Sequence, residues 1–388
     1  MPPTPADAPP ADALRLAALA DRCVQCGLCL PHCPTYRLDR IESEGPRGRI
    51  AYMKAVADGT LAPTPAGDQH LDHCLGCRRC EVVCPAGVEY EALLIGARSL
   101  QFARKPPPLV GRAALAALAS PALGRIALPL GRLAGRLPPV PSGTTILARA
   151  TVDREFHGTV LLFEGCAGRE YEAGTRKSLE ALLERAGFAV EDRPYAPQGC
   201  CGTAAVHAGD VAGAAALARH NREALAETPV RGIPREATRR PVLCLATGCQ
   251  SVLAASLAGV AEVFDALEFL DGEGTDLSFR PATTRVALHR PCSQRVLGSD
   301  AAMLRLLARI PGLDLVELTD TGCCGAAGTH MLSEPARAAA LRAPLLEAFA
   351  ASGATALLSA NLGCRLHLGN AVSMPVRHPI DFLAEHLA

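Results

Sequence analysis

The chain has 388 residues, which is enough for two or three domains of ordinary size. Lys and Arg together number 39, as do Asp and Glu, so no net charge favours nucleic acid. Tryptophan is absent and only 4% of residues are aromatic, which argues against a base-stacking surface for single strands. We therefore expect a protein that binds no nucleic acid.

Cysteine is the informative residue type, because the chain contains 17 of them. The N-terminal segment Met1–Pro10 lacks the basic and apolar regions of a secretory signal, and no apolar run reaches the ~18 residues of a membrane span. We therefore expect a cytoplasmic protein, whose thiols are kept reduced. Clustered cysteines in such a protein more often bind metal or carry out redox chemistry than form disulfides.

Two cysteine runs of identical spacing lie near the N-terminus. Each is C-x2-C-x2-C-x3-C followed by a proline, Pro34 or Pro85. This spacing is typical of bacterial ferredoxins, in which three thiolates hold one [4Fe–4S] cluster and the fourth ligates the other cluster. The pattern predicts two clusters, the first on Cys23, Cys26, Cys29 and Cys84 and the second on Cys74, Cys77, Cys80 and Cys33. Zinc sites and inert buried cysteines are the alternatives, but zinc is usually held by paired C-x2–4-C units.

A helix is predicted between the two runs. Gly45-Pro46 precedes Arg47–Asp58 and Gly59 follows, and proline at the start with glycine past the end is typical of a helix. Two roles are open for Arg47 and Arg49 at its beginning. They either offset the negative charge of a cluster or are simply exposed to solvent.

Residues 101–155 contain no cysteine and separate the N-terminal region from the rest. Residues 101–150 carry seven basic side chains and no Asp or Glu. Prolines and glycines interrupt the helical period, which favours a basic Pro/Ala-rich linker with a few short helices. The alternative is an amphipathic segment that rests on an acidic partner or on a membrane surface. In the membrane case the protein would be peripheral on the inner face of the cytoplasmic membrane.

The remainder of the chain is an internal duplication, with copies at residues 156–275 and 283–388. Each copy opens with an apolar, strand-like run that ends in cysteine, Val160–Cys166 or Val286–Cys292. A helical stretch, Gly-Cys-Cys-Gly, an alanine-rich helix, a second apolar run and a Gly-Cys pair follow in the same order. This alternation predicts an α/β unit in each copy, after a mostly helical domain at residues 1–100. The expected fold class is therefore α/β multidomain, with two cysteine-rich repeats.

Each copy contributes four cysteines at matching positions. The first set is Cys166, Cys200, Cys201 and Cys249, and the second is Cys292, Cys323, Cys324 and Cys364. Four soft ligands that converge from separate loops suit a further iron–sulfur cluster or zinc. A redox-active thiol pair and inert core cysteines are the other interpretations.

A few further residues near these sets bear on the choice of ligands. Cys244 lies in the apolar run Val242–Leu245 and is expected to be a buried strand residue. His367 follows Cys364 by three residues and is a candidate additional ligand, although its counterpart in the first copy is Val252. The remaining candidates are expected to be ordinary polar residues: His207, His289, His330 and His378.

Several segments together resemble the glycolate oxidase iron–sulfur subunit family. They are Arg22–Cys29, Glu44–Ile50, His70–Cys80, Glu164–Cys166, the two Cys-Cys-Gly sequences and Ala360–Cys364. The same modules occur in the third subunit of anaerobic glycerol-3-phosphate dehydrogenase and in heterodisulfide reductase relatives. The heterodisulfide reductase pattern ends each repeat with C-x-x-C, whereas this chain has Val252 and His367 at the last position. That difference argues against five-cysteine clusters of that relative's kind and against disulfide reduction as the activity.

The resemblance implies a complex in which flavoprotein partner subunits oxidise a 2-hydroxy acid such as glycolate. This subunit would pass the electrons singly to a quinone or similar acceptor, and it would contain no catalytic residue of its own. The sequence shows no dinucleotide or phosphate-loop fingerprint, so flavin and NAD are expected on partners. The alternatives are the corresponding subunit of an anaerobic glycerol-3-phosphate or lactate dehydrogenase, a thiol/disulfide reductase, and a scaffold that holds structural zinc.

Overall fold

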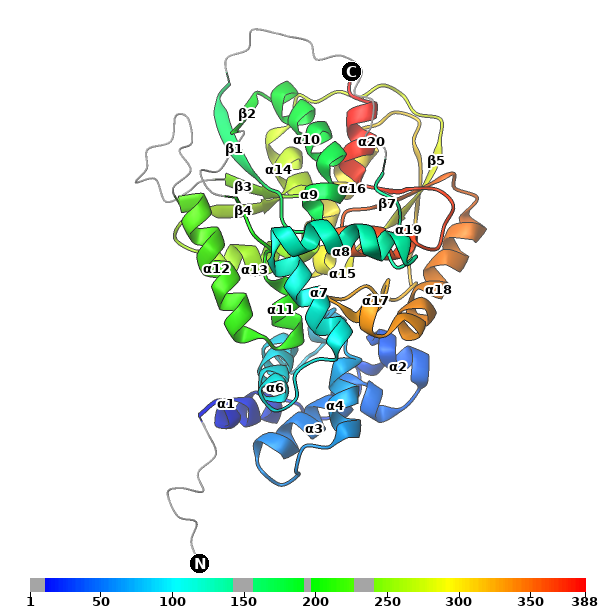
Figure 1. Cartoon of the computed structure of the whole chain (residues 1–388). Helices are drawn as coiled ribbons and strands as arrows, with labels where there is room; N and C mark the ends of the chain where they lie inside the picture. The colour runs from blue at the N-terminus through cyan, green and yellow to red at the C-terminus, as the bar shows by residue number, and fades with distance from the viewer. Residues whose placement is uncertain (1–10, 142–155, 192–196, 227–240) are drawn as a thin grey trace, which may run out of the picture.

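The computed structural model describes residues 11–141, 156–191, 197–226 and 241–388. A helical N-terminal region lies below two α/β repeats that stand side by side (Figure 1). The N-terminal elements are α1 (Ala11–Asp21), η2 (Leu30–His32), α2 (Pro34–Asp39), η3 (Glu42–Glu44), α3 (Pro46–Ala57), α4 (Pro65–Asp72), α5 (Arg79–Val82) and α6 (Tyr90–Arg104). This arrangement confirms the expected fold class.

Helix α3 begins at Pro46 after the N-cap Gly45 and ends at Ala57, so its bounds lie within one residue of the predicted Arg47–Asp58. Its buried Ile50 and Met53 join a core that also includes Leu93 of α6. The two arginines at its start differ in exposure. Arg49 is 1% exposed, whereas Arg47 is partly exposed and pairs with Glu42.

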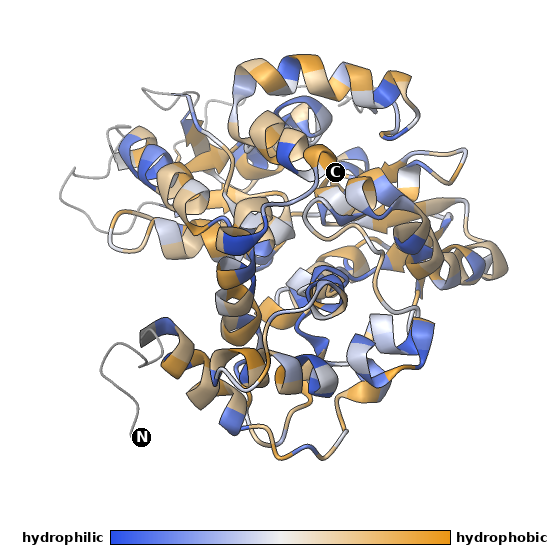
Figure 2. Cartoon of the chain, turned by 60° about the horizontal axis from the view of Figure 1, so that its bottom comes forward, coloured by the Kyte–Doolittle hydropathy of each residue, from blue (hydrophilic) through white to orange (hydrophobic). Residues whose placement is uncertain are grey.

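Two further helices, α7 (Leu109–Ala119) and α8 (Pro121–Leu133), occupy the segment expected to be a linker. They pack against each other and cross the front of the molecule (Figure 1). Pro121 starts α8, and the Ser120 hydroxyl accepts a hydrogen bond from the Leu123 N–H, so a cap and a helix-starting proline explain the break between them. In Figure 2 α8 lies at the upper edge of the molecule and carries both hydrophobic and hydrophilic residues. Within the described part of the chain, no helix is long and apolar enough to cross a bilayer.

The first repeat is a four-stranded parallel sheet with the strand order β2-β1-β3-β4. Its elements are β1 (Gly158–Phe163), α9 (Gly168–Tyr171), α10 (Ala173–Arg185), β2 (Phe188–Glu191), α11 (Thr203–Ala208), α12 (Val211–Ala226), β3 (Pro241–Cys244), α13 (Thr247–Ser256), β4 (Glu262–Asp265) and α14 (Ala266–Glu273). Parallel strands need crossover connections, and the helices supply them.

The second repeat has the equivalent strand order, β6-β5-β7-β8, and is also parallel. Its elements are β5 (Arg285–His289), α15 (Cys292–Leu297), α16 (Asp300–Ala308), β6 (Asp314–Glu317), α17 (His330–Ser333), α18 (Pro335–Ser352), β7 (Ala356–Ser359), α19 (Leu362–Gly369), β8 (Val376–Arg377) and α20 (Pro379–Glu385). The duplication predicted from the sequence is therefore a duplication of fold.

The two repeats share one hydrophobic core. Leu182 of α10, Leu306 of α16 and Leu383 of α20 are fully buried in it. Residues alternate between two faces along each strand, so Leu243 of β3 joins this shared core while its neighbours Val242 and Cys244 face a second cluster. That second cluster contains the cysteines of the first repeat, which lie just beyond the strand ends, where parallel sheets commonly form their sites.

Candidate iron–sulfur centres

The two N-terminal cysteine runs adopt the same local backbone. In each run the residues just before and just after the second cysteine have positive φ, namely Gln25 and Gly27 in the first and Gly76 and Arg78 in the second. Left-handed residues flanking a cysteine make a tight turn and can aim backbone N–H groups at a negatively charged group. The two runs therefore have the same conformation, although Gln25 in the first run corresponds to Gly76 in the second and Gly27 corresponds to Arg78.

The first ferredoxin group is Cys23, Cys26, Cys29 and Cys84. These four residues line one cavity, with Cys80 also on its wall. Burial and, to a smaller extent, the nearby Cys23, Cys26 and Cys84 together raise the pKa of the Cys29 thiol to about 11. Thiolates gathered this closely need a metal to balance their charge. Cys26 is exposed, so this group lies at the surface.

The second ferredoxin group is Cys33, Cys74, Cys77 and Cys80. They line a separate cavity together with Arg49 and Arg78. Burial alone would raise the pKa of Cys74, but the charges of Arg49 and Arg98 outweigh it and lower the pKa. The structure thus brings together the two sets of four that the spacing assigns to separate clusters. Their donor chemistry, four thiols with cationic neighbours, fits an iron–sulfur cluster.

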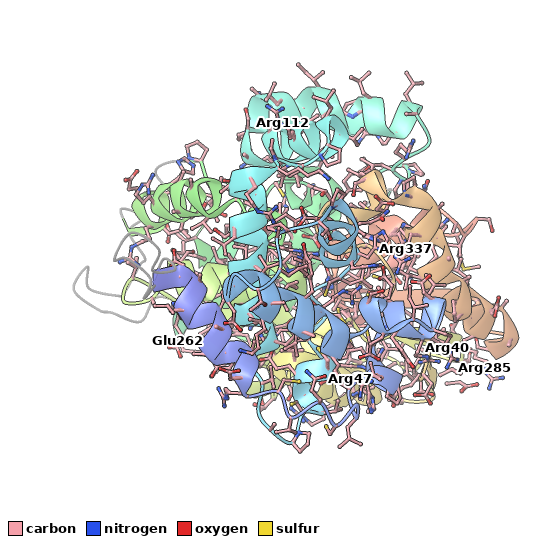
Figure 3. All side chains as sticks on the ribbon, turned by 90° about the horizontal axis from the view of Figure 1, so that it is seen from below. Arg40, Arg47, Arg112, Glu262, Arg285 and Arg337 are labelled. Atoms are coloured by element: carbon pink, nitrogen blue, oxygen red, sulfur yellow. The ribbon has the colours of Figure 1, made fainter. Side chains whose placement is uncertain are left out.

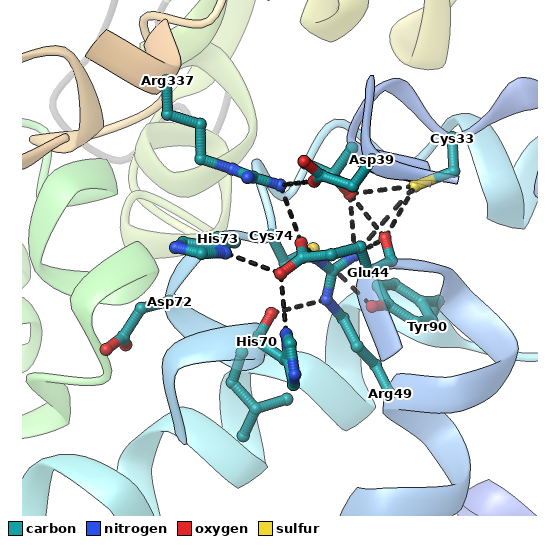
Figure 4. Close-up of polar contacts among 12 residues, drawn as sticks. Cys33, Asp39, Glu44, Arg49, His70, Asp72, His73, Cys74, Tyr90 and Arg337 are labelled. Atoms are coloured by element: carbon teal, nitrogen blue, oxygen red, sulfur yellow. Dashed lines mark hydrogen bonds and ion pairs between the residues drawn. The ribbon is translucent and has the colours of Figure 1, made fainter. Parts of the chain in front are cut away.

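A buried carboxylate beside the second ferredoxin group holds the N-terminal region to the second repeat (Figure 4). The Glu44 carboxylate accepts hydrogen bonds from His70 Nδ1 at 2.7 Å and His73 Nδ1 at 2.6 Å. Its other oxygen accepts from Arg49 at 2.6 Å and from Arg337 of α18 at 2.8 Å. Burial would raise the pKa of Glu44, but the hydrogen bonds from both histidines and the charge of Arg49 lower it to about 2.

No sequence pattern indicates this cluster, because Arg337 is 293 residues from Glu44. Figure 3 shows Arg337 where the N-terminal helices overlie α18. The first repeat is held in a similar way, since Arg98 of α6 donates to the backbone oxygens of Cys74 and His207. Both repeats are thus bonded directly to the region that carries the ferredoxin groups.

The first repeat group is Cys166, Cys200, Cys201 and Cys249. Cys200 lies within hydrogen-bonding reach of Cys166 and Cys201, and Cys201 lies within reach of Cys249. The four thiols therefore form a continuous series. Cys249 also lies within hydrogen-bonding reach of Cys244, for which the sequence predicts only a buried position in a strand.

The second repeat group is Cys292, Cys323, Cys324 and Cys364. Cys292 lies beside Cys323, and the Sγ atoms of Cys324 and Cys364 are 2.8 Å apart. Hydrogen bonding to Cys323 and burial both raise the pKa of Cys292. Four buried thiols of this kind become thiolate ligands when a metal displaces their protons, so this set fits zinc or an iron–sulfur cluster.

His367 is not free to act as a ligand in this structure. Its Nε2 donates to the Ala338 carbonyl at 3.1 Å, and its Nδ1 lies 3.3 Å from an Arg342 nitrogen. His289 and His330 are likewise buried and hydrogen-bonded, and burial lowers the pKa of His289 to about 3. These histidines have structural partners.

The second ferredoxin group touches the second repeat group. Leu75 and Cys77 belong to the same packed cluster as Cys323 and Cys364. Burial raises the pKa of Cys77, and the nearby Cys292 thiol raises it further. Arg79 donates to the Gly322 carbonyl at 2.8 Å, which fixes this contact. Three cysteine groups consequently follow one another from the surface inward.

A cavity of about 320 Å³ adjoins the first repeat group. Helices α7 and α8 form one side of it through Leu118 and Leu128, and Cys166 and Cys200 lie on the other side. Arg125 is also part of its lining. This volume is in the range of small-molecule sites, and the wall consists mainly of apolar groups with a few polar side chains.

Comparison with known proteins agrees with this arrangement. Residues 19–88 match the 4Fe-4S dicluster domain family, and residues 160–250 and 286–369 match the cysteine-rich domain family. The chain is 30% identical to the glycolate oxidase iron-sulfur subunit of Escherichia coli (strain K12), over 97% of this chain and 96% of that protein. It is 29% identical to the probable glycolate oxidase iron-sulfur subunit of Bacillus subtilis (strain 168), over 89% and 87%.

A more distant similarity covers part of the chain. One subunit of the anaerobic glycerol-3-phosphate dehydrogenase of Escherichia coli (strain K12) is 29% identical over 62% of each chain. The first of these relatives is matched over nearly its whole length, and the two domain families coincide with the cysteine groups described above. The chain therefore belongs to the family of glycolate oxidase iron–sulfur subunits.

Proposed function

We propose that this chain is the electron-transfer subunit of a flavin-dependent 2-hydroxy-acid dehydrogenase, with glycolate as the expected substrate. The observation that carries the proposal is the packing of Leu75 and Cys77 in one cluster with the cysteines of the second repeat group, which joins the ferredoxin groups to the second repeat. Bound iron–sulfur clusters would supply one-electron carriers, ligated by the two ferredoxin groups as the spacing predicts. The residues of the chain then determine the order of the clusters and the two surfaces at which electrons enter and leave.

Electrons would enter at the first ferredoxin group. Its Cys26 is exposed, and the neighbouring Val24, Leu28 and Val82 are 69%, 58% and 69% exposed. Exposed apolar side chains around a redox site are typical of a surface that a partner covers. We assign this surface to the flavoprotein subunit that oxidises the substrate.

Electrons would leave from the repeats toward a quinone. The cavity beside Cys166 and Cys200 is large enough for a quinone ring, and Arg125 can donate a hydrogen bond to a ring carbonyl. Helices α7 and α8 cover the cavity and expose Leu109, Ile126, Leu130 and Leu133 beside their arginines. A basic, apolar surface of this kind favours an anionic membrane, where quinones reside.

The corresponding subunit of an anaerobic glycerol-3-phosphate dehydrogenase is the second candidate. Its support is the relative from that dehydrogenase, which matches 62% of the chain. The partner flavoprotein would decide between the two substrates, because the chemistry of oxidation belongs to its flavin. The electron-transfer role of this chain is the same in both cases.

The test uses the complete chain purified without oxygen and mixed with its flavoprotein partner. Addition of glycolate is expected to reduce the iron–sulfur centres, observed by electron paramagnetic resonance, and decylubiquinone is expected to reoxidise them. Glycerol 3-phosphate in place of glycolate separates the two candidates. Centres that stay oxidised with either substrate, although dithionite reduces them, would overturn the proposal.

A further inference from the structure

The two repeats differ at one position beside their cysteines. Cys244 is the last residue of β3 and lies five residues before Cys249. Ser359 is the last residue of β7 and lies five residues before Cys364. The register of the sheets is equivalent too, since Cys244 pairs with Phe163 and Ser359 pairs with His289. The first repeat therefore has a thiol where the second has a hydroxyl.

Cys244 points toward the other thiols of its repeat. It is 1% exposed and packs in one cluster with Cys166, Cys200, Cys201 and Cys249. Its nearest cysteine is Cys249, which lies within hydrogen-bonding reach. The five thiols consequently form one unbroken series, with Cys166 and Cys244 at its two ends.

The local partners of the two positions also differ. The Ser359 hydroxyl and His289 Nδ1 are 3.0 Å apart, so a side-chain hydrogen bond occupies the serine. Cys244 faces Phe163, which offers no such bond, and its thiol donates to the Ala246 carbonyl at 3.2 Å. A thiol held by so weak a bond is free to become a thiolate ligand when a metal displaces its proton.

The number of sulfur donors limits what each repeat can hold. Four thiolates complete the tetrahedral shell of a single zinc or iron ion. Five thiolates exceed that shell, so all five can be used only if the site contains more than one metal ion. Soft thiolate donors suit copper(I), zinc and iron–sulfur clusters, and the membership of this chain in a family of iron–sulfur subunits favours the iron–sulfur cluster.

We propose that Cys244 is a fifth ligand of the first repeat group, which therefore holds a polynuclear iron–sulfur centre, while the second repeat group binds its metal through four cysteines. Cys244 supplies the fifth thiol from the end of strand β3. The two repeats are then chemically unequal despite their equivalent folds. This inference concerns the ligands of one centre and rests on the proposed function only in assuming that the chain carries iron.

The test compares three variants of the complete chain, purified without oxygen. Cys244→Val keeps apolar packing without sulfur, and Cys244→Ser introduces the residue that the second repeat has. Ser359→Ala is the matched control at the equivalent position. Iron, zinc and sulfide are measured per chain, and Mössbauer and electron paramagnetic resonance spectra separate the centres.

Both Cys244 variants are expected to lose or alter the iron component that does not belong to the two ferredoxin clusters, whereas Ser359→Ala keeps the wild-type spectra. Ferredoxin-cluster signals retained in every variant show that the chain is folded. Wild-type iron, sulfide and spectra in Cys244→Val would overturn the inference, as would a wild-type protein whose iron is confined to the ferredoxin clusters. In either case the ferredoxin clusters would still be reduced by the flavoprotein, so the proposed function is tested separately.

Discussion

Arg49 and Glu44 form an ion pair of 2.6 Å in which the side chains are only 1% and 3% exposed. Arg49 also donates to Thr35 Oγ1 at 2.9 Å and to the His70 carbonyl at 2.6 Å. The Nη1 atom of Arg49 lies 4.0 Å from the Cys33 sulfur. The arginine for which the sequence leaves two roles open is therefore buried, and it connects the carboxylate that contacts the second repeat with a cysteine of the second ferredoxin group.

Replacing Arg49 should destabilise the protein strongly. Arg49→Gln removes the more deeply buried of the two arginines that pair with Glu44. Breaking a buried pair from one side costs about 3–5 kcal/mol, and because Arg337 remains the loss should lie at or below the lower end of that range. Denaturant unfolding under anaerobic conditions measures the loss. Lys54→Gln is the control, because Lys54 pairs with Asp58 at the surface and such pairs contribute about 0–1 kcal/mol. Equal losses in the two variants would contradict a special role for the buried pair.

Arg49→Gln should also change the reduction potential of the second cluster. A positive charge favours the more negative, reduced form of a cluster, so its removal should lower the reduction potential. A redox titration followed by electron paramagnetic resonance is expected to show this shift for the second cluster and little change for the first. A shift of the first cluster alone would contradict the proposed assignment of Cys33 to the second.

Cys26→Ser tests the ligand assignment of the first ferredoxin group. Loss of one thiolate should remove one [4Fe–4S] cluster, so iron is expected to fall by about four atoms per chain. Val82→Ser is the control, because Val82 is also exposed and carries no sulfur. Both cluster signals retained in Cys26→Ser would refute the assignment.

The two ends of the electron path can be tested with reciprocal variants. Leu28→Glu places a charge on the surface assigned to the flavoprotein and should weaken that complex by about tenfold or more. Leu133, 86% exposed at the end of α8, belongs to the surface assigned to the membrane. Leu133→Glu should reduce binding to vesicles containing phosphatidylglycerol and leave the flavoprotein complex unchanged. Each variant is the control for the other, and a variant that weakens both interactions equally would contradict the separation of the surfaces.

Much of the site could be predicted because local spacing carries it. The two cysteine runs, the helix that begins at Pro46 and the duplicated Cys-Cys sites are all encoded in short stretches. The alternation in Val242–Leu245 contains the signal for Cys244, since a strand that sends Leu243 into the shared core must send Cys244 to the opposite face. The sequence alone does not say which face of the sheet carries the cysteine group, so the position of Cys244 beside Cys249 follows only from the fold.

Other features depend on distant or non-local causes. Gln25 and Arg78 adopt a left-handed backbone that side chains rarely take, and nothing in their identity indicates it. The Glu44 cluster requires Arg337, and the packed cluster that contains Cys77 and Cys292 requires the N-terminal region to pack against the second repeat. Contacts between domains are decided by whole surfaces, which a motif does not describe.

A pH dependence is expected from Asp265, the N-cap of α14. Its Oδ1 accepts from the backbone N–H groups of Leu267 at 2.8 Å and Glu268 at 3.3 Å. Burial raises the pKa of Asp265 from 3.8 to about 7, although the two backbone hydrogen bonds and the Ser299 hydroxyl lower it. The buried carboxyl is therefore more easily protonated in the folded protein than in the unfolded chain.

The sign of the effect follows from that difference. A carboxyl whose pKa is higher in the folded state costs no stability below its unfolded pKa, near 4, and the cost grows until the pH passes about 7. Asp265→Asn removes the cost and keeps a good N-cap, so the variant should be more stable than the wild type by about 2–4 kcal/mol at about pH 8. The difference in stability between Asp265→Asn and the wild type should become smaller as the pH is lowered toward about 5. Denaturant unfolding across this range checks the prediction, with the exposed Asp276→Asn as the control. A stability difference between wild type and Asp265→Asn that is the same at every pH would show that Asp265 does not titrate differently in the folded and unfolded states.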